Sequence, residues 1–137
     1  MSRSELKLFT DGCARGNPGP AGAGYVITTM DDKVLEEGSK YLGKSETNNM
    51  AEYGAVIVGL SKAMNHSTGI INVFSDSELL VKQLKGEYRI SKSHLRNLSE
   101  QVRKLMKNFK KVTFHHIKRS KNSRADALAN KAVDEAR

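Results

Sequence analysis

The fold is decided within residues 6–42, which read LKLFTDGCARGNPGPAGAGYVITTMDDKVLEEGSKYL. Three segments of this stretch are strand-like, namely 6–11, 23–30 and 33–42. Gly and Pro fill a turn region at 12–21, and Asp31-Asp32 provides a tight connection before the third segment. The stretch therefore predicts a three-stranded antiparallel meander.

A long helix is expected after the meander. Thr47, Asn48 or Asn49 can cap its start, because short polar side chains accept hydrogen bonds from the free N–H groups of the first turn. Apolar and small residues then recur at helical spacing and form its expected stripe: Met50, Gly54, Ile57, Leu60 and Met64. Residues 65–69 end this helix.

Strands and helices alternate over the rest of the chain. Residues 70–75, IINVFS, are almost continuously apolar, as in a central strand buried on both faces. Further elements are expected as a short helix at 77–85, a helix with apolar residues from Leu95 to Phe109, a strand at 112–117, and a last helix. Ser123 and Asp126 resemble a capping box for that last helix, whose expected buried stripe is Leu128, Ala129, Ala132 and Val133. The order predicts an α/β fold with helices packed on a mixed, five-stranded sheet.

Length and composition restrict the class of protein. The 137 residues suit one domain, spanning 1–137, and no apolar run is long enough to cross a membrane. The N-terminal residues show no signal-peptide pattern. The single cysteine, Cys13, excludes an internal disulfide framework and a cysteine-based zinc cluster. A reducing, cytoplasmic location is therefore expected.

Charge is distributed unevenly along the chain. The whole sequence carries +8, but residues 85–121 hold twelve Lys and Arg and only two acids, a net +10, so the remainder carries −2. A basic region beside a mildly acidic one indicates a surface for a polyanion next to a site that needs carboxylates. The alternative is a solvated helix face that aids solubility.

Four acids stand at positions where a solubility role explains them poorly. Asp11 ends the first strand, Asp76 ends the strand at 70–75, and Glu52 and Asp126 lie near the starts of two helices. If the first and fourth strands are neighbours, Asp11 and Asp76 lie side by side at one edge of the sheet. Clustered carboxylates need cations or protons to neutralise them, and a pair of hard divalent ions can promote phosphodiester hydrolysis. The acids and the basic region together predict a nuclease.

Each acid also has an ordinary structural interpretation. Asp76 and Asp126 can act at helix N-termini, and Glu52 can complement the dipole of its helix. Asp11 can be the first residue of an Asp-Gly turn. Spacing alone leaves these alternatives open.

Four blocks of the sequence resemble, in order, the motifs of type 1 ribonuclease H. They are TDGCARGNPGPAGAGYVI, TNNMAEYGAVIVGL, VFSDSELLVKQL and SRADALANKA. The resemblance runs from about residue 6 to 135 and implies the ribonuclease H-like fold. It implies hydrolysis of the RNA strand of RNA–DNA hybrids to 5′-phosphate and 3′-hydroxyl ends. It further implies two ions, Mg²⁺ or Mn²⁺, held by the residues that match the family's acids: Asp11, Glu52, Asp76 and Asp126.

Substrate contacts are implied by the same resemblance. The residues that match the family's minor-groove contacts are Gly12, Cys13, Ala14, Asn17, Asn48 and Asn49. Short amides there can bond 2′-hydroxyls, which distinguish RNA from DNA. Thr47 matches a contact to a DNA phosphate.

The chain departs from the family pattern at three places. Many bacterial members carry a loop His before the last helix, whereas residues 118–125 hold none, and Arg119 is expected in that neighbourhood. The basic protrusion is short, over 85–98, although Lys85 and Arg89 remain. Glu78 stands where relatives often have an amide that touches RNA. His115 and His116 are expected as one packed and one exposed strand residue.

The sequence thus predicts a monomeric, metal-dependent endoribonuclease that acts on RNA–DNA hybrids. One alternative is a related nuclease that also cuts double-stranded RNA, which Asn48 and Asn49 do not exclude. The other is a hybrid-binding module without catalysis, against which the four acids argue. The preferred ion and the action on single ribonucleotides are not determined by the sequence.

Overall fold

The computed structural model describes residues 4–136 and contains one five-stranded sheet within them. The strands are β1 (Glu5–Ala14), β2 (Gly19–Thr29), β3 (Val34–Glu46), β4 (Ile70–Ser75) and β5 (Lys111–His116). The helices are α1 (Asn48–Ala63), α2 (Glu78–Leu84), α3 (Ser93–Met106) and α4 (Ser123–Glu135), and a short 3-10 helix, η1 (Arg119–Lys121), precedes α4.

The strand order is β3-β2-β1-β4-β5. β1 pairs antiparallel with β2, and β2 pairs antiparallel with β3, which confirms the meander. β4 lies parallel to both β1 and β5. The mixed five-stranded sheet is therefore as predicted, and β1 and β4 end at the same edge of it.

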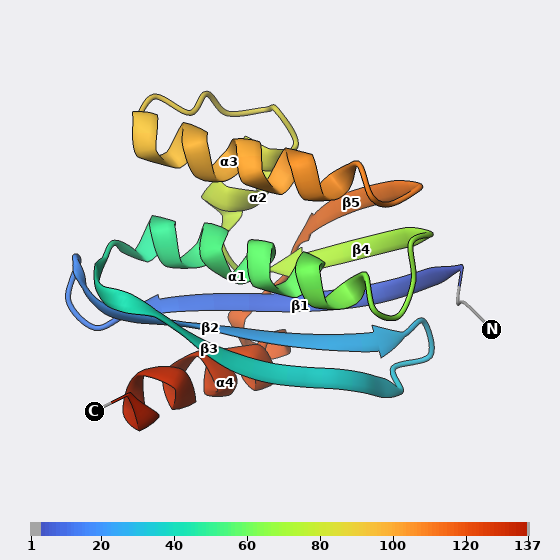
Figure 1. Cartoon of the computed structure of the whole chain (residues 1–137), viewed down its shortest axis with the longest axis horizontal. Coiled ribbons are helices and arrows are strands. Elements are labelled where there is room, and N and C mark those ends of the chain that lie inside the picture. Colours follow the sequence, from blue (N-terminus) through green and yellow to red (C-terminus); the bar gives the residue numbers. More distant parts are fainter. Residues whose placement is uncertain (1–3, 137) are drawn as a thin grey trace.

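Helices cover both faces of the sheet (Figure 1). α1 lies against one face with α3 packed on it, and α4 lies on the other face against β1, β2 and β3. The main core forms between the sheet and α1, with fully buried Leu8, Ile27, Val56, Leu60 and Val73 among its members. Burial of this apolar surface is the main contribution to the stability of the folded state.

α1 begins where the sequence indicates, but its most deeply buried face is shifted from the expected stripe, of which Met50 and Ile57 pack at the edge of the core. The Thr47 hydroxyl accepts a hydrogen bond from the Met50 N–H at 3.1 Å, so Thr47 is the N-cap. Of the expected stripe only Leu60 is fully buried, and Met64 is 37% exposed. The buried face consists largely of small residues: Ala51, Ala55, Val56, Gly59 and Ala63. Such residues let the helix backbone approach the sheet closely, and this decides which face turns inward.

Two close approaches bring helix backbones onto the strands. A Cβ at Gly12 would lie 2.2 Å from the carbonyl carbon of Ala51 in α1. A Cβ at Gly24 would lie 2.1 Å from the carbonyl oxygen of Ala125 in α4. Only glycine permits these distances, so β1 and β2 are pressed against the helices that carry Glu52 and Asp126.

The structure corrects several expected strand features. β1 extends to Ala14 and β2 starts at Gly19, so most of the region at 12–21 is strand rather than turn. β4 is fully buried on one face only, because α4 covers the neighbouring strands and not β4 itself. His115 and His116 are both exposed by surface area, although the His115 ring stacks on Phe74 with the ring centroids 5.0 Å apart.

Two helix boundaries also differ from expectation. Phe109 is buried but lies beyond α3, which ends at Met106. The capping box of Ser123 and Asp126 does not form: Ser123 is already helical, and the preceding residue, Asn122, is the N-cap without a side-chain cap bond. The buried stripe of α4, from Leu128 to Val133, is as predicted.

Among the helices of residues 4–136, none has the length and apolar character needed to cross a membrane.

Candidate active site

Neighbouring parallel strands bring two of the acids together. The last register pair of β1 and β4 is Phe9 with Phe74. Asp11 and Asp76 each follow two residues later, so they occupy equivalent places on adjacent strands. Ligand sites of α/β sheets commonly lie at such strand ends.

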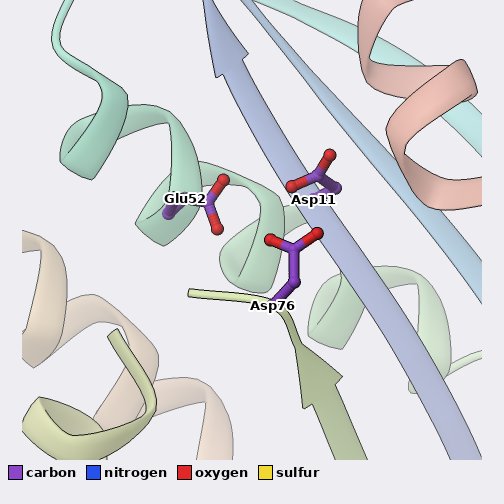
Figure 2. A group of neighbouring side chains, drawn as sticks. All are labelled: Asp11, Glu52 and Asp76. Carbon is purple, nitrogen blue, oxygen red and sulfur yellow. The ribbon is translucent and has the colours of Figure 1, made fainter. Parts of the chain in front are cut away.

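The carboxylates of three acids converge at this edge (Figure 2). One ligand oxygen from each of Asp11, Glu52 and Asp76 lies within 4.8 Å of the others. Glu52 reaches them from α1, as Figure 2 shows. The acids open into a hollow of about 420 Å³, here called the acid cleft, which is lined by Asp11, Gly12, Cys13, Ala14, Asn48, Glu52, Asp76, Arg119 and Asp126.

Glu52 is held in place by the backbone of β1. Its residue is 8% exposed, and its Oε1 accepts a hydrogen bond from the Gly12 N–H at 2.9 Å. Its Oε2 lies 3.5 Å from the hydroxyl of Ser75 at the end of β4. The close approach at Gly12 therefore both packs α1 on β1 and fixes the Glu52 carboxylate.

Asp126 lines the acid cleft from the α4 side but lies outside the group of three. Its proximity is one of the causes that raise the pKa of Asp11, after burial and the charge of Glu52. Its Oδ1 is 4.0 Å from Nη2 of Arg119, and Nδ2 of Asn130 lies 3.4 Å from the same oxygen. The structure thus brings all four predicted acids to one cleft, with Asp126 contributed by α4 and outside the group of three.

The acids strongly perturb one another. Burial, and secondly the charge of Glu52, raise the pKa of Asp11 to about 10. Burial raises the pKa of Glu52 to about 7, against the opposing effect of the Gly12 N–H. The cluster therefore favours protons or cations between its carboxylates.

The donor set fits hard divalent ions. Three carboxylates within 4.8 Å supply only oxygen ligands, which Mg²⁺ and Mn²⁺ favour over nitrogen and sulfur. Such ions would replace protons in the cluster and offset both the burial and the repulsion of its carboxylates. Asp11, Glu52 and Asp76 could hold an ion directly.

The ordinary interpretations fit three of the four acids poorly. Ser77, not Asp76, is the N-cap of α2. Glu52 lies beyond the first turn of α1, and Asp11 lies within β1 rather than in a turn. Asp126 makes no capping bond, but it does lie in the first turn of α4, where its charge also complements the helix dipole. Local structure therefore accounts for the position of Asp126 but not for those of Asp11, Glu52 and Asp76.

A second hollow of about 400 Å³ lies beside the N-terminus of α1. We call it the asparagine hollow, and it is lined by Asn17, Thr47, Asn48, Asn49, Lys92, His94 and Leu95. The Asn48 N–H donates to Oδ1 of Asn17 at 3.0 Å, and Oδ1 of Asn48 accepts from the Ala14 N–H at 3.2 Å. Asn48 lines both hollows and so joins them.

Eight of the sequence-predicted substrate residues line these two hollows: Gly12, Cys13, Ala14, Asn17, Thr47, Asn48, Asn49 and Arg119. The other three lie elsewhere. Glu78 is within 3.9 Å of Lys82, and Lys85 is within 3.5 Å of Glu87. Arg89 is exposed in the segment between α2 and α3. None of Glu78, Lys85 and Arg89 lines either hollow.

The structure adds residues that sequence reasoning did not select for the site. His94 joins the asparagine hollow because α3 starts beside α1, and nothing in its sequence context indicates this. Lys92 is visible in the sequence only as one of many basic residues. Asn122 is buried next to Asp76, and its only sequence signal is its position four residues before Asp126.

Comparison with known proteins agrees with this geometry. A family described as reverse transcriptase-like matches residues 9–132. A ribonuclease H from Lachnoclostridium phytofermentans is 33% identical over 95% of this chain and 92% of its own length. The chain belongs to the ribonuclease H family.

Other relatives of this ribonuclease H chain are more similar in sequence. Ribonuclease HI of Halobacterium salinarum is 40% identical over 96% of this chain, which spans only 65% of that protein. The chain spans 36% of a mycobacterial relative that is 39% identical.

Solved structures have the same fold. The crystal structure of RNase H1 from Halobacterium salinarum matches with a TM-score of 0.92 at 37% identity, over 96% of this chain and 98% of that one. LC11-RNase H1, solved in complex with an RNA/DNA hybrid, matches with a TM-score of 0.91 at 38% identity, over the same shares of the two chains.

Proposed function

We propose that this ribonuclease H chain is a divalent-metal-dependent endoribonuclease that hydrolyses the RNA strand of RNA–DNA hybrids. The products are 5′-phosphate and 3′-hydroxyl ends. The observation that carries the proposal is the convergence of Asp11, Glu52 and Asp76 within 4.8 Å at the strand ends of this fold. A relative that is 38% identical binds an RNA/DNA hybrid, which supports the substrate class.

In this proposal the four acids hold two ions, Mg²⁺ or Mn²⁺. Bound ions would supply positive charge that makes a water more nucleophilic and stabilises the leaving oxygen. Asp11 is the central ligand, because it interacts with Glu52, Asp76 and Asp126. Gly12 and Ser75 orient Glu52 through the two oxygens of its carboxylate.

The two hollows position the hybrid. Gly12, Cys13 and Ala14 present backbone and small side chains, so an RNA strand can come close to the acids. Asn17, Asn48 and Asn49 lie beside them with amides that can bond 2′-hydroxyls and base edges. Thr47 and Lys92 are suited to a phosphate of the paired DNA strand.

Arg119 takes the place of the loop His that many bacterial members carry. Its side chain is 83% exposed at the rim of the acid cleft, within 4.0 Å of Asp126. A guanidinium there can contact a phosphate next to the scissile one. Glu78, Lys85 and Arg89, which lie outside both hollows, stay predicted contacts to more distant parts of the duplex. The monomeric state and the cytoplasmic location also stay predictions.

The proposal is tested with three end-labelled duplexes, an RNA–DNA hybrid, double-stranded RNA and double-stranded DNA, each with Mg²⁺ or Mn²⁺. Wild type is compared with Asp76→Asn, and with Glu135→Gln as a control that removes one exposed charge in α4. We expect cleavage of RNA in the hybrid by wild type and control, and a loss of at least about 100-fold in Asp76→Asn.

Other outcomes point to the alternatives. Cleavage of double-stranded RNA in addition would mean a less selective groove. Hybrid binding with no cleavage under either ion would overturn the enzyme and leave a binding module, in which Asp76→Asn has no functional effect.

A further inference from the structure

Asn122 lies between the segments that carry the acids. Its residue is 2% exposed. Nδ2 donates to the Thr10 carbonyl oxygen at 2.9 Å and lies 3.5 Å from Oδ2 of Asp76. Because Thr10 directly precedes Asp11 in β1, this one amide bridges the ends of β1 and β4.

The backbone of Asn122 fixes the third segment. Its N–H donates to the Arg119 carbonyl at 3.0 Å, which closes η1, and its carbonyl accepts from the Asp126 N–H at 3.1 Å, which starts α4. The residue therefore has contacts to the segments that carry Asp11, Asp76 and Asp126. Each of its backbone polar groups is paired, which fixes the backbone, and burial together with the Nδ2 bond to Thr10 restricts the side chain.

Only a hydrogen-bond donor suits the position of Nδ2 of Asn122. An asparagine amide carries two N–H donors, and here they face a carbonyl and a carboxylate, which are both acceptors. The reverse orientation would place Oδ1 against those two oxygens. In the observed orientation, Oδ1 is buried and without a partner among the described residues. A buried, unpaired oxygen destabilises the fold. This orientation of the amide therefore keeps the contacts of Nδ2 to Thr10 and Asp76 at a cost in stability.

Resting on the nuclease function proposed above, we propose that Asn122 is a positioning residue for the divalent-ion site. It touches neither substrate nor ion. It sets the spacing between Asp11, Asp76 and Asp126, so its loss lowers the affinity for the ions and the turnover. Hybrid binding depends on the two hollows and is unaffected. Removal of such supporting contacts typically weakens metal binding by about 10–100-fold.

The experiment measures ion binding by the full chain without nucleic acid. Mn²⁺ binding is followed by electron paramagnetic resonance, and Mg²⁺ binding by calorimetry. Asn122→Ala removes the donor, Asn122→Asp replaces it with acceptors of the same shape, and Asn122→Ser retains a hydroxyl donor. Ser67→Ala is the matched control, because Ser67 is 3% exposed and accepts from the Gly69 N–H at 2.9 Å, at the end of β4 remote from Asp76.

We expect about 10-fold or weaker ion binding in Asn122→Ala, a larger loss in Asn122→Asp, and partial recovery in Asn122→Ser. With hybrid, kcat should fall while KM stays near that of wild type. Ser67→Ala should lower the unfolding temperature without a change in ion affinity. If Asn122→Ala does not fold, Asn122→Ser carries the comparison.

Wild-type ion affinity in a folded Asn122→Ala or Asn122→Ser variant would overturn the proposal. So would a loss that Ser67→Ala shares in proportion to its loss of stability. A failure of the proposed nuclease function would look different. The wild-type protein would then neither bind the ions nor cleave hybrid, and the positioning role would be overturned as well.

Discussion

At the scale of single residues, Asp11 in the acid cleft lowers the stability of the metal-free protein. Asp11 is buried beside Glu52 and Asp76, and both neighbours raise its pKa in addition to the effect of burial. The ionised form of the Asp11 carboxylate therefore destabilises the metal-free fold. Replacement of one acid by its amide removes the repulsion and keeps the shape of the side chain.

We expect Asp11→Asn to stabilise the metal-free protein. At pH 8 with a chelator, the free energy of unfolding should rise by about 1–3 kcal/mol, since one pKa unit corresponds to about 1.4 kcal/mol. Chemical denaturation checks this. Glu135→Gln, at an exposed position, should change little. If Asp11→Asn instead lowers the free energy of unfolding, contacts within the protein stabilise the Asp11 carboxylate even without ions.

The same acids give the metal-free protein a characteristic pH dependence. The pKa of Asp11, about 10, and that of Glu52, about 7, both lie above their unfolded values. The folded state thus binds more protons, and its stability falls as pH rises. We expect wild type with chelator to lose stability from pH 6 to pH 9, and added Mg²⁺ to remove most of that loss. An equal slope in Asp11→Asn would contradict the assignment.

At the scale of elements, close backbone contacts decide where the acids lie. Gly12 lets α1 reach β1, and Gly24 lets α4 reach β2. Without them each helix would move outward and carry Glu52 or Asp126 away from Asp11. The glycines of the meander therefore have a role in the site as well as in the fold.

We expect Gly24→Ala to lower the free energy of unfolding by about 1–3 kcal/mol, the usual cost of overpacking. It should also weaken Mg²⁺ binding, because α4 must shift away from the 2.1 Å contact at Ala125. Gly86→Ala is the control: nothing lies within 4 Å of its Cβ, although its φ of 81° imposes strain. Calorimetry with and without Mg²⁺ separates the effects, since only Gly24→Ala should alter ion binding.

At the scale of the whole molecule, the basic region and the acid cleft have different roles in the proposed function. Residues 85–121 carry a net +10 over α3, β5 and the segments around them. Within this region Lys92 borders the asparagine hollow and Arg119 borders the acid cleft. In the proposed function the basic region provides long-range attraction for a duplex, and the acids need local cations that a duplex alone does not bring.

Hybrid binding should therefore fall steeply with salt. With Asp76→Asn as background, the slope of log affinity against log salt should decrease by about 1 when Lys92→Ala is added. Lys33→Ala, in the hairpin between β2 and β3, should leave the slope unchanged. Fluorescence anisotropy at several salt concentrations checks this. Equal slopes in all three proteins would mean that the asparagine hollow does not contact a phosphate.

Much of the fold follows from local patterns in the sequence. The meander, β4 and the buried stripe of α4 are confirmed, because strand alternation and helical spacing are properties of neighbouring residues. The four acids are also visible, since Asp76 follows a strand, Glu52 and Asp126 lie near the starts of helices, and Asp11 precedes the Gly-rich stretch of β1. For α1 the spacing of apolar residues did not predict the most buried residues, which are largely small. How closely the backbones of a helix and a sheet approach is not visible in such spacing.

Local patterns were enough to predict the strands, the family resemblance and the identities of the four acids. The packing of the helices on the sheet was needed to bring three of them together, with Asp126 contributed to the same cleft by α4. The same packing brought Asn122 against Thr10 and Asp76, and His94 to the hollow that Asn17 lines. The reason is physical: periodicity follows from bonds between near neighbours in the chain, whereas a site depends on contacts between residues tens of positions apart. Those contacts exist only once the helices have packed on the sheet.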